Sequence, residues 1–335
     1  MRINTEMLTK TARDHVAKRL RQPNDIVAVY LTGSVTSEEP LLGGTTDIDM
    51  VFVHKEDPAQ SREVLRVTYE VSFDIEHHHQ SYYTYHRRLR QNPWIGFSLC
   101  NHGNILHDTD HWLEFIQAGV SSQFDTPENI HARAQKFNEK ARQQWFDLND
   151  EQEIRFQEWM DLYFKTTGAA ANTIAALNGP ALTIRRFMIA FPERAQALGQ
   201  ASLSGELARL IGNDKMSLDL YRDWRPAWEF ALRSASAMPN CPPNISSHRK
   251  GYFLNACDAL AEGDALHAVL WPMLETWRQA DLVLADEPAQ QENWLQFLSA
   301  LDFVPERKDD LLQALDRFID AGDNILRDYR QNYGL

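Results

Sequence analysis

Two aspartates one residue apart are the residues of this sequence best suited to hold a metal ion. Asp47 and Asp49 open an apolar run that reaches Val53 and is typical of a buried strand. Because successive strand side chains point to opposite faces, the two carboxylates project from one face, about 7 Å apart along the strand. Neighbouring carboxylates repel each other, and a divalent cation with hard oxygen ligands relieves that repulsion. The pair therefore predicts a Mg²⁺ site.

The end of the preceding apolar run could supply the phosphate-binding half of such a site. Residues 26–31 are followed by Thr32, Gly33 and Ser34, and a polar loop leads from there to Thr46. Glycine permits a tight turn close to an anion, and the serine hydroxyl and the backbone N–H groups after it can donate to phosphate oxygens. We therefore expect these four named residues to bind a nucleotide.

A third acidic ligand is expected from the next predicted strand. Residues 67–76 alternate between apolar and polar side chains, which indicates a half-buried strand within 64–77. Glu70 and Asp74 both lie on the polar face of this strand. The pattern leaves the choice between these two acids open.

Residues 1–110 resemble the nucleotidyltransferase superfamily, which has a DNA polymerase β-like fold, and in particular its kanamycin-type aminoglycoside nucleotidyltransferases. The shared features are the Gly-Ser corner, the acid-x-acid strand, Trp94 at the family's interval after Asp74, and a segment at 103–108 that ends in an aspartate. The resemblance implies that Asp74 is the third ligand. It also implies transfer of a nucleoside monophosphate from a triphosphate to a hydroxyl, with release of pyrophosphate and with two Mg²⁺ ions held by the three aspartates.

The resemblance further implies a general base in a helical domain. In the kanamycin-type enzymes, a glutamate of that domain takes the proton of the acceptor hydroxyl. Glu158 is our candidate for this role, and Asp161 on the same predicted helix is the second choice. The alternative for both residues is a solvent-facing helix surface.

The patterning of the chain predicts two domains. The resemblance implies that the first, at 1–120, is an α/β (α+β) nucleotidyltransferase domain with a small mixed β-sheet, and continuous helical periodicity predicts an all-α helical domain at 121–335. The elements expected in the first domain are a helix at 4–21, strands at 26–32, 48–54 and 64–77, a helix at 81–91 and a short strand near 104–106. The helices expected in the second domain lie at 126–146, 150–177, 181–191, 193–211 and 216–237, with three or four more over 245–333. The third of these helices is expected to end before Pro192.

Three histidines and two groups of arginines could also contact a ligand. Among His77, His78 and His79, only the first and third share a strand face, and no third metal ligand is evident, so a polar strand end is favoured. Surface charge on a helix is likewise favoured over triphosphate binding for the arginines. The arginines concerned are Arg87, Arg88, Arg90, Arg185 and Arg186.

The composition bears on the substrate and on the compartment. A formal net charge of −13 disfavours a nucleic-acid substrate and favours a small, cationic or neutral acceptor. Three cysteines without metal-ligand spacing predict free thiols in a reducing compartment, and no stretch approaches the roughly 18 apolar residues that span a bilayer. We therefore expect a cytoplasmic protein outside the membrane, and homo-oligomer formation stays open. Acids expected near the predicted site are Glu38, Glu39, Glu70 and Glu76.

A different class of function is the alternative to an enzyme. Some proteins with the nucleotidyltransferase fold are catalytically inert binding or regulatory modules, such as antitoxin-like partners of a helical toxin. Those modules are usually a minimal single domain, whereas this chain carries about 200 further residues and keeps all three acids. The enzyme is therefore the favoured hypothesis.

Overall fold

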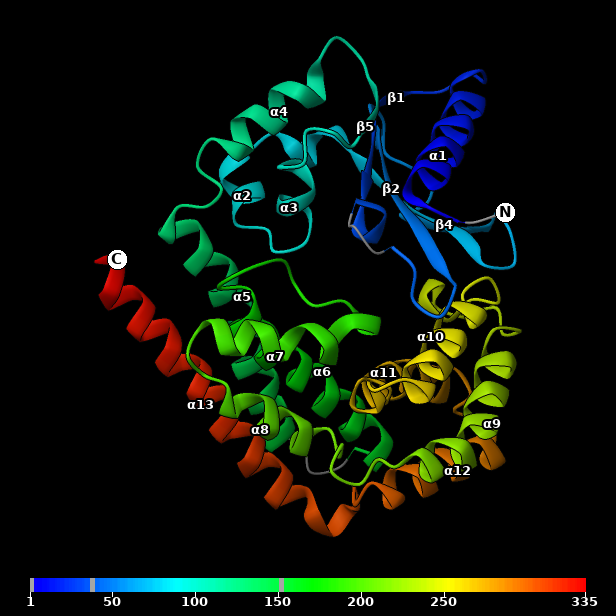
Figure 1. Cartoon of the computed structure of the whole chain (residues 1–335), viewed down its shortest axis with the longest axis vertical. Helices are drawn as coiled ribbons and strands as arrows, with labels where there is room; N and C mark the ends of the chain where they lie inside the picture. Colours follow the sequence, from blue (N-terminus) through cyan, green and yellow to red (C-terminus); the bar gives the residue numbers. More distant parts are fainter. Residues whose placement is uncertain (1–2, 37–39, 151–153) are drawn as a thin grey trace. The chain divides into compact units, whose positions relative to one another are not determined.

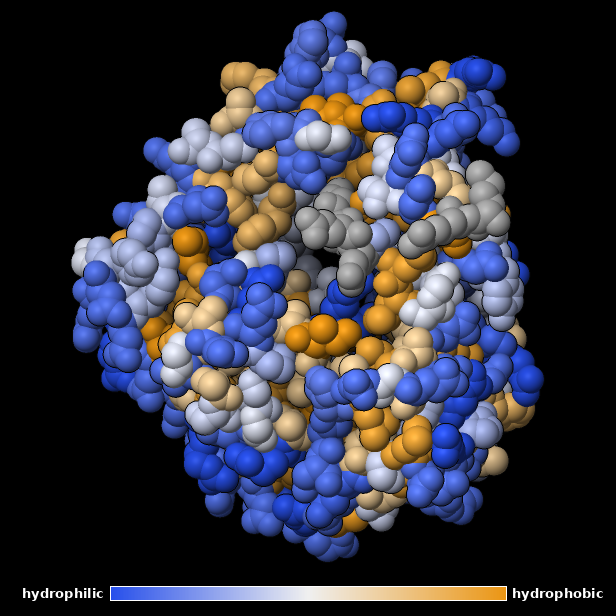
Figure 2. All heavy atoms as spheres, in the orientation of Figure 1, coloured by the Kyte–Doolittle hydropathy of each residue, from blue (hydrophilic) through white to orange (hydrophobic). Residues whose placement is uncertain are grey.

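The structure is a computed structural model that describes residues 3–36, 40–150 and 154–335 (Figure 1). The chain divides into two compact units, Met1–Asn129 and Ile130–Leu335. From the sequence we expected this division after residue 120. None of the helices in the three described ranges combines the length and the apolar character that crossing a bilayer requires. The face drawn in Figure 2 is mostly hydrophilic, with smaller apolar groups between the polar side chains.

A five-stranded mixed sheet forms the centre of the first unit. The strands lie side by side in the order β3-β4-β2-β1-β5. β2 and β4 run parallel, and every other neighbouring pair is antiparallel. This small mixed sheet confirms the mixed α/β class expected from the sequence. The strands are β1 (Ile26–Thr32), β2 (Thr46–His54), β3 (Arg62–Arg66), β4 (Val71–His79) and β5 (Ile105–Asp108).

Alternation along β2 places apolar side chains in two cores, one on each face of the sheet. Ile48, Met50 and Phe52 pack into a core that also contains buried side chains of α1. Val51 and Val53 pack into a second core, which contains buried side chains of α3 and α4. Figure 1 shows α1 beside the sheet. The α-helices of this unit, up to the start of α5, are α1 (Thr5–Leu20), α2 (His86–Arg90), α3 (Ile95–Leu99) and α4 (Trp112–Ser121).

The single strand expected at 64–77 is in fact two antiparallel strands, β3 and β4, so this prediction is wrong. Thr68 lies in the turn between them, and its hydroxyl accepts the backbone N–H groups of Glu70 and Val71 at 3.2 and 3.1 Å. Such local bonds offer the backbone an alternative to a continuous strand. The period-two pattern continues across the turn, which contains neither glycine nor proline, so the pattern could not reveal it.

The second unit is helical throughout the part that the structure describes, in agreement with the expected all-α domain. Its core includes Trp277 of α11, which stacks on Phe297 of α12 with ring centres 4.9 Å apart. The α-helices from the unit boundary onward are α5 (Pro127–Asp150), α6 (Phe156–Ala175), α7 (Phe187–Ala197), α8 (Ser202–Leu210), α9 (Leu218–Ala235), α10 (Lys250–Glu262), α11 (Leu270–Val283), α12 (Pro288–Ala300) and α13 (Lys308–Tyr333).

Two helix boundaries in this unit differ from expectation. α7 continues through Pro192, because Phe191 and Ala195 beside it are fully buried and their packing outweighs the hydrogen bond that proline removes. The next expected helix is interrupted at Gly199, whose φ is +71°, and the N–H of Gln200 donates to the carbonyl of Ala195. A left-handed glycine followed by such a bond is a common helix end.

Candidate metal centre

Three aspartates from two parallel strands come together in the first unit. The pairing of β2 with β4 places Asp49 opposite Asp74 and Asp47 opposite Ser72. One carboxylate oxygen of each aspartate lies within 4.8 Å of the other two. Asp47 and Asp74 are buried, and Asp49 is half-buried. The structure therefore brings together the three residues that we predicted as metal ligands, which we call the aspartate cluster.

Glu70, the alternative third acid, lies outside the aspartate cluster. It belongs to the turn between β3 and β4, where it is exposed and accepts a hydrogen bond from the hydroxyl of Thr68 at 2.9 Å. The parallel register of the strands therefore decides in favour of Asp74. Glu76, further along β4, pairs instead with His78 at 3.3 Å, and this hydrogen bond lowers the pKa of Glu76.

An arginine that the sequence patterns did not single out is paired with the cluster. Arg62 begins β3, and its Nε and Nη2 donate to Oδ1 and Oδ2 of Asp74 at 2.7 and 2.5 Å. The Asp74 side chain is 4% exposed, whereas that of Arg62 is 29% exposed. A bidentate pair of this kind is stronger than a single charged contact. Only the register of the β3–β4 hairpin could have pointed to Arg62. In this register Arg62 lies opposite Glu76, and Asp74 is its diagonal neighbour on β4.

The backbone at the end of β1 closes one side of the cluster. Thr32, the last residue of β1, pairs with Asp49. Gly33 has a φ of +66°, and a Cβ at this position would lie 1.8 Å from Oδ2 of Asp49. Only glycine combines this backbone conformation with so close an approach. Two of the four predicted nucleotide-binding residues therefore lie directly beside the acids.

The other two predicted nucleotide-binding residues are Thr46 and Ser34, and the structure shows only the side chain of Thr46. Thr46 is buried, and its hydroxyl donates to the backbone carbonyl of Asp47 at 3.1 Å. Its side chain therefore serves the start of β2. The side chain of Ser34 lies outside the described part of the structure, as do Glu38 and Glu39.

The two candidate bases, Glu158 and Asp161, lie on α6 in the second unit, and each is part of an ion pair there. Arg155 donates to Glu158 through Nε and Nη2 at 3.0 and 2.7 Å. Asp161 is buried, accepts from Nη1 of Arg278 at 2.5 Å and lies 2.6 Å from Nζ of Lys165. Asp161 therefore links α6 to α11, whereas Glu158 keeps more access to solvent.

A further acid of the second unit, which was not among the candidates, has a strongly raised pKa. Asp281 on α11 is 4% exposed, and its Oδ1 has no hydrogen-bond partner among the described residues. Burial raises the pKa of Asp281 to about 7; the charge of Arg155 opposes this change and that of Asp161 adds to it. Buried acids with such shifts are frequent at functional sites. The sequence could not single out Asp281, because burial within a helical unit is not visible in a single helix pattern.

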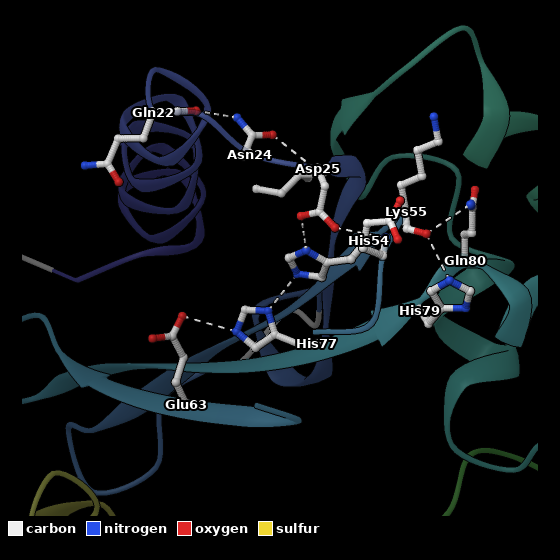
Figure 3. A network of polar contacts seen from close by, with 11 residues as sticks. Gln22, Asn24, Asp25, His54, Lys55, Glu63, His77, His79 and Gln80 are labelled. Atoms are coloured by element: carbon white, nitrogen blue, oxygen red, sulfur yellow. Dashed lines mark hydrogen bonds and ion pairs between the residues drawn. The ribbon is translucent and has the colours of Figure 1, made fainter. Parts of the chain in front are cut away.

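The histidines at the end of β4 belong to separate hydrogen-bond networks. Nδ1 of His77 lies 2.9 Å from Nε2 of His54, whose Nδ1 lies 2.9 Å from Oδ1 of Asp25 (Figure 3). Nε2 of His77 lies 3.2 Å from Oε1 of Glu63. His79 contacts a serine hydroxyl and a backbone carbonyl instead. Since His77 and His79 contact different groups, the structure agrees with the polar strand end that we expected.

The arginines singled out in the sequence have unlike surroundings. Arg87 and Arg88 are exposed, as expected, whereas Arg90 donates twice to a backbone carbonyl of α4 at 3.2 and 2.6 Å. Arg185 is buried, with its guanidinium carbon 3.4 Å from the centre of the Tyr252 ring and Nη1 donating to the Tyr252 carbonyl at 3.1 Å. The expectation of surface charge is therefore wrong for Arg185, because an aromatic face and a carbonyl compensate its burial.

No protein-family model matches the chain, and no curated protein does so either. The fold and the site define a mixed α/β protein of two compact units, with a group of three aspartates that could hold a metal ion. Its function has to be inferred from the geometry of that group.

Proposed function

We propose that this chain is a Mg²⁺-dependent nucleotidyltransferase. The reaction moves a nucleoside monophosphate from a nucleoside triphosphate to a hydroxyl of a small acceptor and releases pyrophosphate. One observation carries the proposal: the oxygens of Asp47, Asp49 and Asp74 lie within 4.8 Å of one another, and the Gly33 backbone passes directly beside Asp49.

The donor set fits magnesium. Carboxylate oxygens are the hard ligands that Mg²⁺ prefers, and buried carboxylates such as Asp47 and Asp74 are costly without a compensating positive charge. Asp47 and Asp49 are the proposed ligands of two ions, and Asp74 of one. Bound ions supply the neutralisation of charge on the reacting phosphate that such a transfer requires.

The backbone and side chains next to the cluster are the proposed triphosphate contacts. Because Gly33 has no side chain, its backbone lies directly against the Asp49 carboxylate, so a phosphate bound by the N–H groups of this turn would lie beside the proposed metal ligands. The N–H groups of the turn Gly33–Thr36 and the hydroxyl of Ser34 are the proposed donors to the phosphate oxygens. Thr32 and Thr46 are the proposed flanking contacts, at the end of β1 and the start of β2.

Glu158 is the proposed general base for the acceptor hydroxyl. Its carboxylate is partly exposed and held by Arg155, so it can both accept a proton and keep its orientation. Asp161 is less suited, because it is buried and paired with Arg278 and Lys165, so an acceptor hydroxyl has less access to it than to Glu158.

The composition supports the proposed acceptor and the proposed compartment. With a net charge of −13, the chain attracts a cation and repels a polyanion, so an aminoglycoside-like or neutral small molecule is preferred over RNA. The three cysteines are free thiols, which fits the reducing cytoplasm, where triphosphates and Mg²⁺ are supplied.

The test combines activity with binding. The protein is incubated with each labelled nucleoside triphosphate, Mg²⁺ and a panel of aminoglycosides, sugars and bacterial lysate, and both transferred label and pyrophosphate are measured. Asp47→Asn and Asp49→Asn keep the side-chain shape but lose the charge, so we expect them to lose transfer and calorimetric binding of Mg²⁺ with ATP. Asp14→Asn on the exposed face of α1 is the matched control. Equal binding of Mg²⁺ with ATP by wild type and the three variants would exclude Asp47 and Asp49 as metal ligands.

An inert binding module is the second candidate. The Arg62–Asp74 pair favours it, because a third acid already neutralised by an arginine requires no metal. Such a module would release no pyrophosphate from any nucleotide with any acceptor. Transfer that depends on Asp47 and Asp49 would exclude it.

A further inference from the structure

Both oxygens of one acid in the aspartate cluster are occupied by an arginine of the same sheet. Nε and Nη2 of Arg62 donate to the two Oδ atoms of Asp74 at 2.7 and 2.5 Å. The guanidinium is a fixed positive charge that stays protonated at any relevant pH. A divalent cation that uses Asp74 as a ligand must therefore share or displace this contact.

We propose that Arg62 is a built-in counter-ion that competes with divalent cations for Asp74. This inference rests on the proposed metal site and states the order in which metal ions bind there. A first ion binds to Asp47 and Asp49, and Asp74 becomes a ligand only after Arg62 has released it.

The charges of the cluster favour this order. With all three acids ionised, these four side chains carry a net charge of −2, which a single divalent ion balances. A second divalent ion would leave the cluster with excess positive charge in a site where two of the three acids are buried. A bound triphosphate brings further negative charge. Nucleotide binding therefore favours both the binding of a second ion and the release of Asp74 by Arg62.

A released Arg62 has another carboxylate close by. Arg62 lies opposite Glu76 in the β3–β4 pairing, and side chains of directly opposite residues project from one face. Since the Arg62 side chain is 29% exposed, its guanidinium can turn from Asp74 to Glu76 without crossing the core.

The experiment titrates Mn²⁺ alone, without nucleotide or acceptor, and follows bound ion by electron paramagnetic resonance and calorimetry. We expect Arg62→Gln to bind Mn²⁺ about tenfold more tightly than wild type, because one adjacent opposite charge changes the cation affinity of a carboxylate by about that factor or more. Arg13→Gln removes the same charge from the exposed face of α1 and should stay within about twofold of wild type.

A double-mutant cycle separates competition from a structural role. Asp74→Asn should change Mn²⁺ affinity little in the wild-type background but abolish most of the gain in the Arg62→Gln background. Circular dichroism and thermal unfolding check that each variant is folded. Unchanged or weaker Mn²⁺ binding by a folded Arg62→Gln would overturn the proposal. Because no nucleotide is present, this result would leave the transferase proposal intact, and a protein without transferase activity could still give the expected titration.

Discussion

Among single residues, Gly33 is the one whose backbone lies directly against the carboxylate of a proposed metal ligand, Asp49. We predict that Gly33→Ala weakens Mn²⁺ binding by about tenfold or more, because a Cβ placed 1.8 Å from Oδ2 of Asp49 forces that carboxylate to move. The unfolding free energy should also fall by about 1 kcal/mol or more, since φ is +66°. Calorimetric titration with Mn²⁺ and urea unfolding measure the two effects.

Gly44→Ala is the control for Gly33→Ala. Gly44 has a similar φ of +70°, but among the described residues no atom beyond its two chain neighbours lies within 4 Å of a Cβ at that position. It should therefore lose comparable stability and keep the metal affinity. If Gly33→Ala binds Mn²⁺ as well as Gly44→Ala does, Asp49 is not a ligand.

The buried acid Asp281 makes a second prediction at this scale. Its pKa in the folded protein is raised to about 7 from the ordinary value of 3.8, so the unfolded chain loses this proton first as the pH rises. The unfolding free energy should therefore fall between about pH 4 and pH 7, by at most about 4 kcal/mol. Asp281→Asn should remove this fall and be more stable than wild type at pH 8.

Urea unfolding of wild type and Asp281→Asn between pH 4 and pH 8 checks this prediction. Asp286→Asn, an exposed change near the end of the same helix, serves as control and should follow the wild-type profile. Parallel profiles for wild type and Asp281→Asn would mean that Asp281 is ionised throughout.

The residues of the candidate site differ in whether the sequence pattern alone points to them. Asp47 and Asp49 are visible from strand alternation, and Gly33 from its place after an apolar run. Asp74 required the resemblance, because a period-two pattern cannot show where a hairpin turns. Arg62 and Asp281 left no signal, since one depends on the register of β3 against β4 and the other on burial by neighbouring helices.

At the scale of elements, the ends of β2 and β4 are tied by a chain of three hydrogen bonds (Figure 3). The chain runs from Asp25 through His54 and His77 to Glu63. Burial lowers the pKa of His77, although the charge of Glu63 opposes this change. We therefore predict that His77 loses its proton at a lower pH in the folded protein than in the unfolded chain.

The lowered pKa of His77 makes stability depend on pH. Because the unfolded chain binds this proton more readily than the folded protein does, the unfolding free energy should fall as the pH drops below about 6.5. His77→Gln should reduce this fall, and His79→Gln, on the same strand but outside the chain, should keep it. Urea unfolding between about pH 5 and pH 7.5 measures it, and equal slopes for wild type and His77→Gln would contradict it.

The helices and strands differ in whether neighbouring residues in the sequence or distant packing partners determine where they begin and end. α5 begins at Pro127, as its sequence predicts, because proline at a first helical position acts within one turn. The β3–β4 turn was missed because it uses the Thr68 hydroxyl in place of glycine or proline. α7 passes through Pro192 because distant residues bury its neighbours, and such packing leaves no mark in a short sequence window.

At the scale of the whole molecule, the net charge of −13 is the property that bears most on the acceptor. A field of this sign raises the local concentration of a cation and lowers that of a polyanion. Salt weakens the effect, because the screening length falls from about 30 Å at 10 mM to about 10 Å at 100 mM ionic strength. We therefore predict that kcat/KM for a cationic acceptor falls several-fold over this range of salt.

A matched pair of acceptors isolates this effect from any effect of salt on the protein. An aminoglycoside and its fully N-acetylated derivative offer the same hydroxyls, but only the first is a polycation. Salt should reduce kcat/KM for the aminoglycoside and leave that for the neutral derivative nearly constant, because only the charged molecule is drawn by the field of the protein. Equal salt dependence for the two would exclude electrostatic attraction of the acceptor. Label found mainly on RNA in the lysate would contradict the argument from charge altogether, since a chain of this charge can hold a polyanion only through a local basic surface that overrides its overall field.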